Sequence, residues 1–107
     1  MRLLLPVLLL LVAMPSAQTP PPFEVQEATI AGIHAAMRAG RITCRGLVEQ
    51  YLRRIDTYDK NGPAINAIIL TNPDAVKQAD ELGRRFAQSG PVGPLHCVPM
   101  IVKDNFE

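Results

Sequence analysis

The sequence predicts an α/β fold in which a mixed β-sheet is flanked by helices, and three observations support this class. Apolar residues recur with a helical period in three segments, residues 29–39, 43–58 and 73–87. Two short apolar runs, residues 64–70 and 98–103, lack that period and are typical of strands. Strand, helix and strand then follow one another, as in a right-handed crossover of parallel strands. We expect the sheet to be incomplete in this chain, because no further element follows the second run.

Length, composition and charge limit the functions that the chain can have. With 107 residues and 48% hydrophobic content it can bury a modest core. The formal net charge is only +1, which gives no electrostatic basis for binding nucleic acid or an anionic membrane surface. We therefore expect no nucleic-acid partner.

Residues 1–17 have the pattern of a signal peptide. Arg2 supplies the positive start, residues 3–12 are mostly apolar, and residues 13–17 are mostly small. The apolar run is shorter than the ~20 residues that a membrane-spanning helix needs. We expect cleavage after Ala17, a secreted or periplasmic protein, and no stable membrane association once the leader is removed. A leader that escaped cleavage would act as an anchor.

Residues 18–26 follow as a proline-rich linker. The run Pro20-Pro21-Pro22 favours an extended, polyproline-like chain with no chemical role. Phe23 and Val25 form an apolar pair at the end of this linker, and we expect them to dock on the domain. That domain then occupies residues 27–107.

The domain opens with two consecutive amphipathic helices. Thr29 is suited to cap the first helix and Gly40 to end it, while Thr43 is suited to cap the second. His34 lies near the apolar stripe of the first helix. We expect a half-buried, hydrogen-bonded histidine there, because no partner at metal-ligand spacing accompanies it.

The sequence does not decide whether the two cysteines form a disulfide. Cys44 opens a helix and Cys97 lies in a turn before a strand, so nothing in the sequence requires them to be neighbours. An oxidising compartment would allow a disulfide. We expect two free thiols.

Lys103 is the candidate for chemistry. It ends the apolar run 98–103, and the carboxyl ends of parallel strands are where α/β folds place their sites. Burial disfavours a charged ammonium, and a neutral lysine is a base. The alternative is that Lys103 simply emerges into water or pairs with Asp104 or Glu107.

A longer motif surrounds this lysine: Gly-Pro-Leu-His-Cys-Val-Pro-Met-Ile-Val-Lys-Asp-Asn, residues 93–105. It resembles the segment of amidase signature family enzymes in which a Gly-Pro-Leu-His-Gly-hydrophobic-Pro turn leads into a strand that ends in Lys-Asp. The resemblance implies that Lys103 is the base of a Ser-cisSer-Lys triad, whose two serines would lie further along the chain. It implies no metal and no cofactor. Cys97 departs from the family, which usually has glycine there, a residue suited to a positive φ.

The resemblance implies that residues 27–107 are the N-terminal portion of an amidase domain. The full-length protein is then expected to hydrolyse the C–N bond of a small-molecule carboxamide, while the chain itself would be inactive. An alternative within the family is the amide-hydrolysing component of a transamidase that acts on tRNA-bound glutamate. The alternative outside it is a small secreted binding or structural module, in which Lys103 is only a surface charge.

Overall fold

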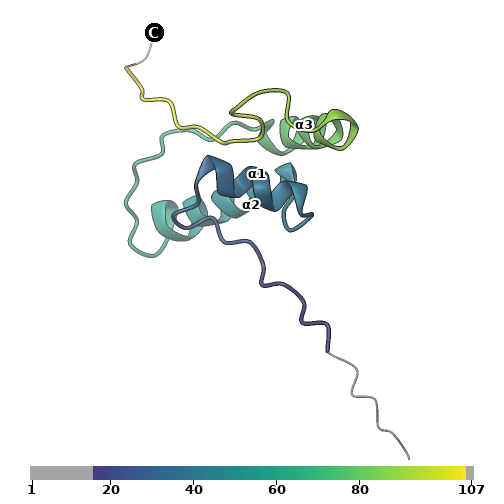
Figure 1. The fold of residues 1–107 in the computed structure, drawn as a ribbon. Coiled ribbons are helices and arrows are strands. Elements are labelled where there is room, and N and C mark those ends of the chain that lie inside the picture. The colour runs from purple at the N-terminus through teal and green to yellow at the C-terminus, as the bar shows by residue number, and fades with distance from the viewer. Residues whose placement is uncertain (1–15, 106–107) are drawn as a thin grey trace, which may run out of the picture.

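The computed structural model describes residues 16–105, and these form helices joined by extended segments (Figure 1). The helices are α1 (Ile30–Arg38), α2 (Cys44–Arg54), a π-helical turn η1 (Ile55–Lys60) and α3 (Ala75–Ser89). No strand occurs in this range, so the expected mixed sheet, and with it the α/β class, is wrong for the described residues. Most of the expected signal peptide, residues 1–15, lies outside them. None of the described helices has the length and apolar character that crossing a membrane requires.

Helix α1 begins and ends at the residues that its sequence indicates. The hydroxyl oxygen of Thr29 accepts a hydrogen bond from the N–H of Gly32 at 3.0 Å, which satisfies one free donor of the first turn. At the other end, the N–H of Arg41 donates to the carbonyl of Ala36 at 2.9 Å. Gly40 has a φ of 69°, as this type of helix ending requires.

Helix α2 is shorter than expected, because its last part changes to a wider helix. Thr43 caps its first turn by accepting from the N–H of Gly46 at 3.0 Å. The expected helix over residues 43–58 is α-helical only to Arg54 and continues as η1. In η1 the N–H of Asn61 donates to the carbonyl of Asp56 at 3.0 Å, five residues back, which is the π-helical spacing.

Helix α3 begins slightly later than expected and packs along α2. The side-chain oxygen of Asn72 accepts from the N–H of Asp74 at 2.9 Å, which turns the chain into the helix. The helix ends where Gly90 takes a φ of 74°. Arg45 of α2 reaches Asp80 of α3 with an N···O distance of 2.8 Å. This exposed ion pair aligns the two helices but stabilises them little.

The first expected strand, residues 64–70, is an extended segment tied to η1. The N–H of Ile65 donates to the carbonyl of Tyr58 at 3.2 Å, and the N–H of Ala67 donates to the Asp59 carboxylate at 2.6 Å. These backbone N–H groups donate to η1 and so cannot donate to a neighbouring strand. Ala64 and Asn66 have φ values of 50° and 54°, which also interrupt a strand. The segment is therefore mostly exposed.

Asp59 is the buried anchor of this segment. Its carboxylate accepts from the backbone N–H groups of Ala67 and Ile68, and the ammonium of Lys60 lies 3.0 Å away. Burial by itself would raise the pKa of Asp59, but the hydrogen bonds from Lys60, Ala67 and Ile68 outweigh it. The pKa of Asp59 is accordingly lower than that of a free aspartate.

The second expected strand, residues 98–103, is also extended and unpaired. Met100, Ile101 and Val102 are between 66% and 80% exposed, so this run is not buried by the described residues. Pro99 has no N–H to donate to a ladder. The helices pack on one another and leave the segment without a partner strand.

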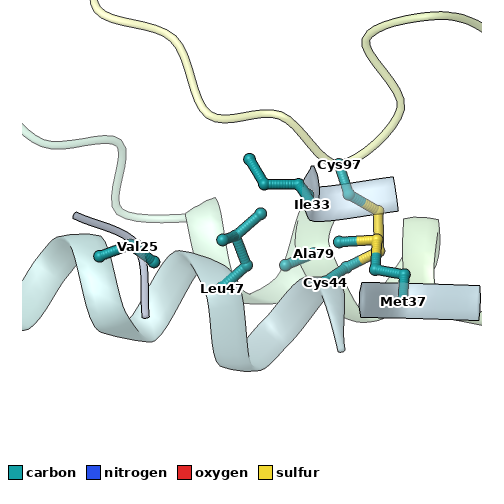
Figure 2. Packing of buried hydrophobic residues seen from close by; sticks show 7 residues of the cluster. All are labelled: Val25, Ile33, Met37, Cys44, Leu47, Ala79 and Cys97. Carbon is teal, nitrogen blue, oxygen red and sulfur yellow. A yellow bond between two sulfur atoms is a disulfide. The ribbon is translucent and has the colours of Figure 1, made fainter. Parts of the chain in front are cut away.

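The core lies where the three helices meet the turn before this segment (Figure 2). Leu47 of α2 is fully buried at its centre. The linker end docks as expected: Val25 is buried, Phe23 packs against the core, and the amide of Gln50 donates to the Phe23 carbonyl at 3.0 Å. The buried apolar cluster consists of Val25, Ile33, Met37, Cys44, Leu47, Ala79 and Cys97.

Candidate active site

Lys103, the predicted base, is the last residue of the extended segment 98–103. Figure 1 shows this part of the chain, in yellow, running away from the helices. Its side chain is exposed, and within residues 16–105 it forms no ion pair. The expectation that Lys103 ends a buried strand is therefore wrong for these residues. The reason is that the described chain supplies no neighbouring strand or helix to cover residues 99–103.

The turn before this segment, residues 93–98, is compact and well anchored. The N–H of His96 donates to the carbonyl of Gly93 at 3.2 Å, and the N–H of Val98 donates to that of Leu95 at 3.0 Å. Cys97 has a φ of 62°, the left-handed conformation that glycine adopts most readily. The cysteine thus keeps a glycine-like backbone, at a cost of about 1–2 kcal/mol.

Two histidines hold the turn to α1 and α3. The Nε2–H of His34, on α1, donates to the carbonyl of His96 at 2.9 Å. The Nε2–H of His96 donates in turn to the carbonyl of Leu82, on α3, at 3.0 Å, and its ring lies 6.0 Å from that of Phe86. The expectation of a hydrogen-bonded His34 is confirmed by this contact, although the side chain is more buried than expected.

A disulfide holds the same turn to α2. Cys44 and Cys97 are bonded to each other, with their Cα atoms 5.3 Å apart (Figure 2). The expectation of two free thiols is wrong. The turn brings Cys97 back over the start of α2, and this approach joins residues that are 53 positions apart in sequence.

Cys44, His96 and Cys97 are also a group of potential metal ligands whose ligand atoms all lie within 4.8 Å of one another. Their ligand atoms are already engaged, however. The two sulfur atoms are bonded together, and His96 accepts from the N–H of Val92 at Nδ1 while it donates at Nε2. In this oxidised state the group acts as an anchor for the turn.

The two best-formed hollows on the described surface do not include Lys103. One lies on α3 between Asp74 and Arg84, and the other lies between residues 22–25 and the end of α2. Charged and polar side chains on a single helix face form most of the first. These hollows therefore do not identify a substrate pocket beside the candidate base.

The sequence identified Lys103 but missed the three anchors of the turn that leads to it. The signal for one of them was present, because Cys97 replaces a glycine and the chain has one other cysteine, Cys44. The two histidine contacts have no such signal. In each contact the acceptor is a backbone carbonyl. Every residue has one, so the sequence does not indicate which carbonyl the histidine will bind.

Comparisons with known proteins point to one family. The family model described as Amidase matches residues 46–107. The chain is 40% identical over 85 residues to a probable amidase of Arabidopsis thaliana, covering 78% of this chain and 16% of that protein. It is 41% identical over 83 residues to a glutamyl-tRNA(Gln) amidotransferase subunit of Alkalilimnicola ehrlichii, covering 77% of this chain and 16% of that protein. No solved structure matches significantly.

The chain spans less than a fifth of the length of these curated relatives. The family model nevertheless covers most of α2, all of α3 and the motif of residues 93–105. Identity of about 40% over more than three quarters of this chain is not explained by a common helical pattern alone. The chain belongs to the amidase family.

Proposed function

We propose that the full-length protein is an amidase that hydrolyses the C–N bond of carboxamides, with Lys103 as the catalytic base. The observation that carries this proposal is the motif of residues 93–105, which lies within the part of the chain that matches the amidase family. The similarity to a probable amidase of Arabidopsis thaliana supports the same reaction class.

The proposed chemistry is that of a Ser-cisSer-Lys triad. The neutral amine of Lys103 takes a proton, through a bridging serine, from a nucleophilic serine that attacks the amide carbonyl. The C–N bond then breaks, the nitrogen accepts a proton and departs as ammonia or an amine, and the serine is left as an acyl-enzyme. Water cleaves this acyl-enzyme, which releases the carboxylic acid and restores the serine. Of the three residues, only the lysine is assigned to a position in this chain. The reaction as proposed uses no metal and no organic cofactor.

Substitution of Lys103 tests this role in the full-length protein. Arginine keeps the positive charge but does not give up its proton, so Lys103→Arg and Lys103→Ala should both abolish hydrolysis. The measurement is kcat/KM for ammonia release from a panel of small carboxamides, with folding checked by circular dichroism. Lys77→Arg, on α3 and away from the motif, is the matched control and should remain active.

The proposal fails if well-folded Lys103→Arg keeps more than about a tenth of the wild-type kcat/KM, a loss below ~1.4 kcal/mol of transition-state stabilisation. Lys103 would then be a structural or electrostatic residue. The same assay must show wild-type activity on at least one carboxamide, since otherwise the variants cannot be ranked.

A second candidate is the amide-hydrolysing component of a transamidase, which the similarity to a glutamyl-tRNA(Gln) amidotransferase subunit favours. Such a component would release ammonia from glutamine for transfer to glutamyl-tRNA. A purified protein that hydrolyses simple carboxamides but does not support this transfer with partner proteins present is an amidase. A protein with the opposite behaviour belongs to a transamidase.

We also propose that the protein is exported. The signal-peptide pattern of residues 1–17 supports export, and so does the Cys44–Cys97 disulfide, because such bonds persist mainly in oxidising compartments. The test is N-terminal sequencing of the protein from the periplasm or medium, where the mature chain should begin at Gln18. An intact Met1 in a reducing compartment would refute export.

A further inference from the structure

The Cys44–Cys97 disulfide connects the first residue of α2 to the turn that leads to Lys103. Cys44 is 2% exposed and Cys97 is 6% exposed, so the bond lies within the core (Figure 2). A reductant reaches it only when the turn opens. The bond is thus a protected structural link at the base of the candidate active-site segment.

The disulfide holds Cys97 in an unfavourable backbone conformation. Its φ of 62° crowds the Cβ atom of any residue other than glycine against the backbone. The bond to Cys44 keeps Cys97 in this conformation, and the hydrogen bonds at His96 fix the residue before it. If the bond were absent, Cys97 could relax to a negative φ, and the chain would leave the turn in another direction.

A change in backbone direction at Cys97 would change the position of Lys103. Lys103 follows six residues later, and the N–H of Val98 makes the last hydrogen bond of the turn. In the described part of the chain, no hydrogen bond joins residues 99–105 to the helices. Within residues 16–105, the disulfide and the Val98 bond are therefore the last constraints before the proposed base.

We infer that the Cys44–Cys97 disulfide is a positioning bond for the catalytic lysine, which holds cysteine in the conformation that glycine would take unaided. The inference rests on the proposed function of Lys103. It makes the activity of this amidase dependent on oxidation of the pair, through the direction of the segment that carries the base.

The oxidation state changes by ordinary thiol–disulfide exchange. A dithiol such as dithiothreitol gives two electrons and two protons to the bond between the sulfur atoms. That bond breaks, Cys44 and Cys97 become thiols, and dithiothreitol closes to its cyclic disulfide. Removal of the reductant and addition of oxidised glutathione reverses the change, with reduced glutathione as the product.

The first experiment compares the oxidised and reduced full-length enzyme. Peptide mapping by mass spectrometry confirms the Cys44–Cys97 cross-link before reduction and its loss afterwards. We expect kcat to fall by at least about tenfold on reduction, KM to change by less than about twofold, and reoxidation to restore activity. Assays are run below the melting temperature of each form, so that unfolding does not contribute.

The second experiment uses two variants that both lack the bond. Cys44→Ala/Cys97→Ala keeps a Cβ atom at residue 97, whereas Cys44→Ala/Cys97→Gly removes it. We expect the glycine variant to keep a several-fold higher kcat than the alanine variant, because only glycine adopts the positive φ without strain. Neither variant should respond to dithiothreitol.

The outcomes separate this inference from the proposed function. If Lys103→Arg is inactive but reduced wild-type enzyme keeps its kcat within about twofold, only the positioning role fails. If Lys103→Arg is active, the proposed function fails and the inference fails with it. A missing cross-link in the oxidised protein, equal kcat for the two variants, or a loss of activity that follows loss of folding would each overturn the inference.

Discussion

The Nε2 atom of His34 lies 2.9 Å from the carbonyl oxygen of His96, and this hydrogen bond joins α1 to the turn before Lys103. Both residues are buried, so the His96 carbonyl has little contact with water in the folded protein. Together with the bond from His96 to Leu82 and the disulfide, it fastens one short turn to each of the three α-helices.

Replacement of His34 by alanine should therefore destabilise the full-length protein by about 1–3 kcal/mol, because a buried carbonyl is left unpaired. His34→Gln is the matched control, since its side-chain amide can donate from a similar position. The measurement is the free energy of unfolding in urea. Equal loss in the two variants would show that packing of the ring, and not the hydrogen bond, is what matters.

Leu47 should be a strong determinant of stability. It is fully buried between the helices, and Leu47→Ala should cost about 2–5 kcal/mol through lost apolar contacts and the cavity left behind. Leu70→Ala removes the same atoms from a side chain that is 84% exposed and should cost far less in this chain. If Leu70→Ala were the more damaging in the full-length protein, residues 64–70 would be buried there by another part of that protein.

The contacts of Asp59 should weaken in acid. Its pKa is lowered in the folded protein, so its contribution to stability is complete above the pKa of a free aspartate, about 4, and is lost as the pH falls through the lower folded value. The expected result is faster hydrogen exchange at Ala67 and Ile68 in that acid range, beyond the intrinsic pH effect. Asp59→Asn should show the faster exchange already at pH 7, whereas Asp74→Asn, at an exposed position with no capping bond, should not.

The exposed apolar segments should make the chain unstable in isolation. Ile69, Leu70, Ile101 and Val102 are between 66% and 84% exposed, which is unusual for such residues in a soluble monomer. Residues 18–107, expressed alone, should aggregate or bind a hydrophobic dye strongly. Ile69→Lys combined with Ile101→Lys should reduce dye binding, while Lys77→Arg should not. A monomeric sample with a sharp thermal transition would contradict this expectation.

The helices were predictable because their signals are local. Thr29 and Thr43 accept hydrogen bonds from residues three positions later, and Gly40 ends a helix through contacts within five positions. Such interactions depend only on the neighbouring sequence, so they are encoded in it directly. The motif at residues 93–105 was likewise sufficient to indicate the family that the comparisons then showed.

Whether the two apolar runs form strands does not depend on their local sequence alone. An apolar run becomes a strand only if another strand satisfies its N–H and C=O groups, and within residues 16–105 neither run has such a partner. In residues 64–70, η1 takes donors that a partner strand would have used. Residues 98–103 were expected to form a strand on the same assumption, and within residues 16–105 they do not.

By itself, the sequence determined the presence of three helices, the N-caps of α1 and α2, and the family, because these depend on short-range periodicity and on an ordered motif. Only the tertiary structure decided that Cys44 and Cys97 are bonded and that His34 reaches the carbonyl of His96. These contacts join residues 53 and 62 positions apart, and such an approach is set by how α1, α2 and α3 pack around one turn. No local pattern specifies that packing, because it results from the burial of the whole apolar cluster at once.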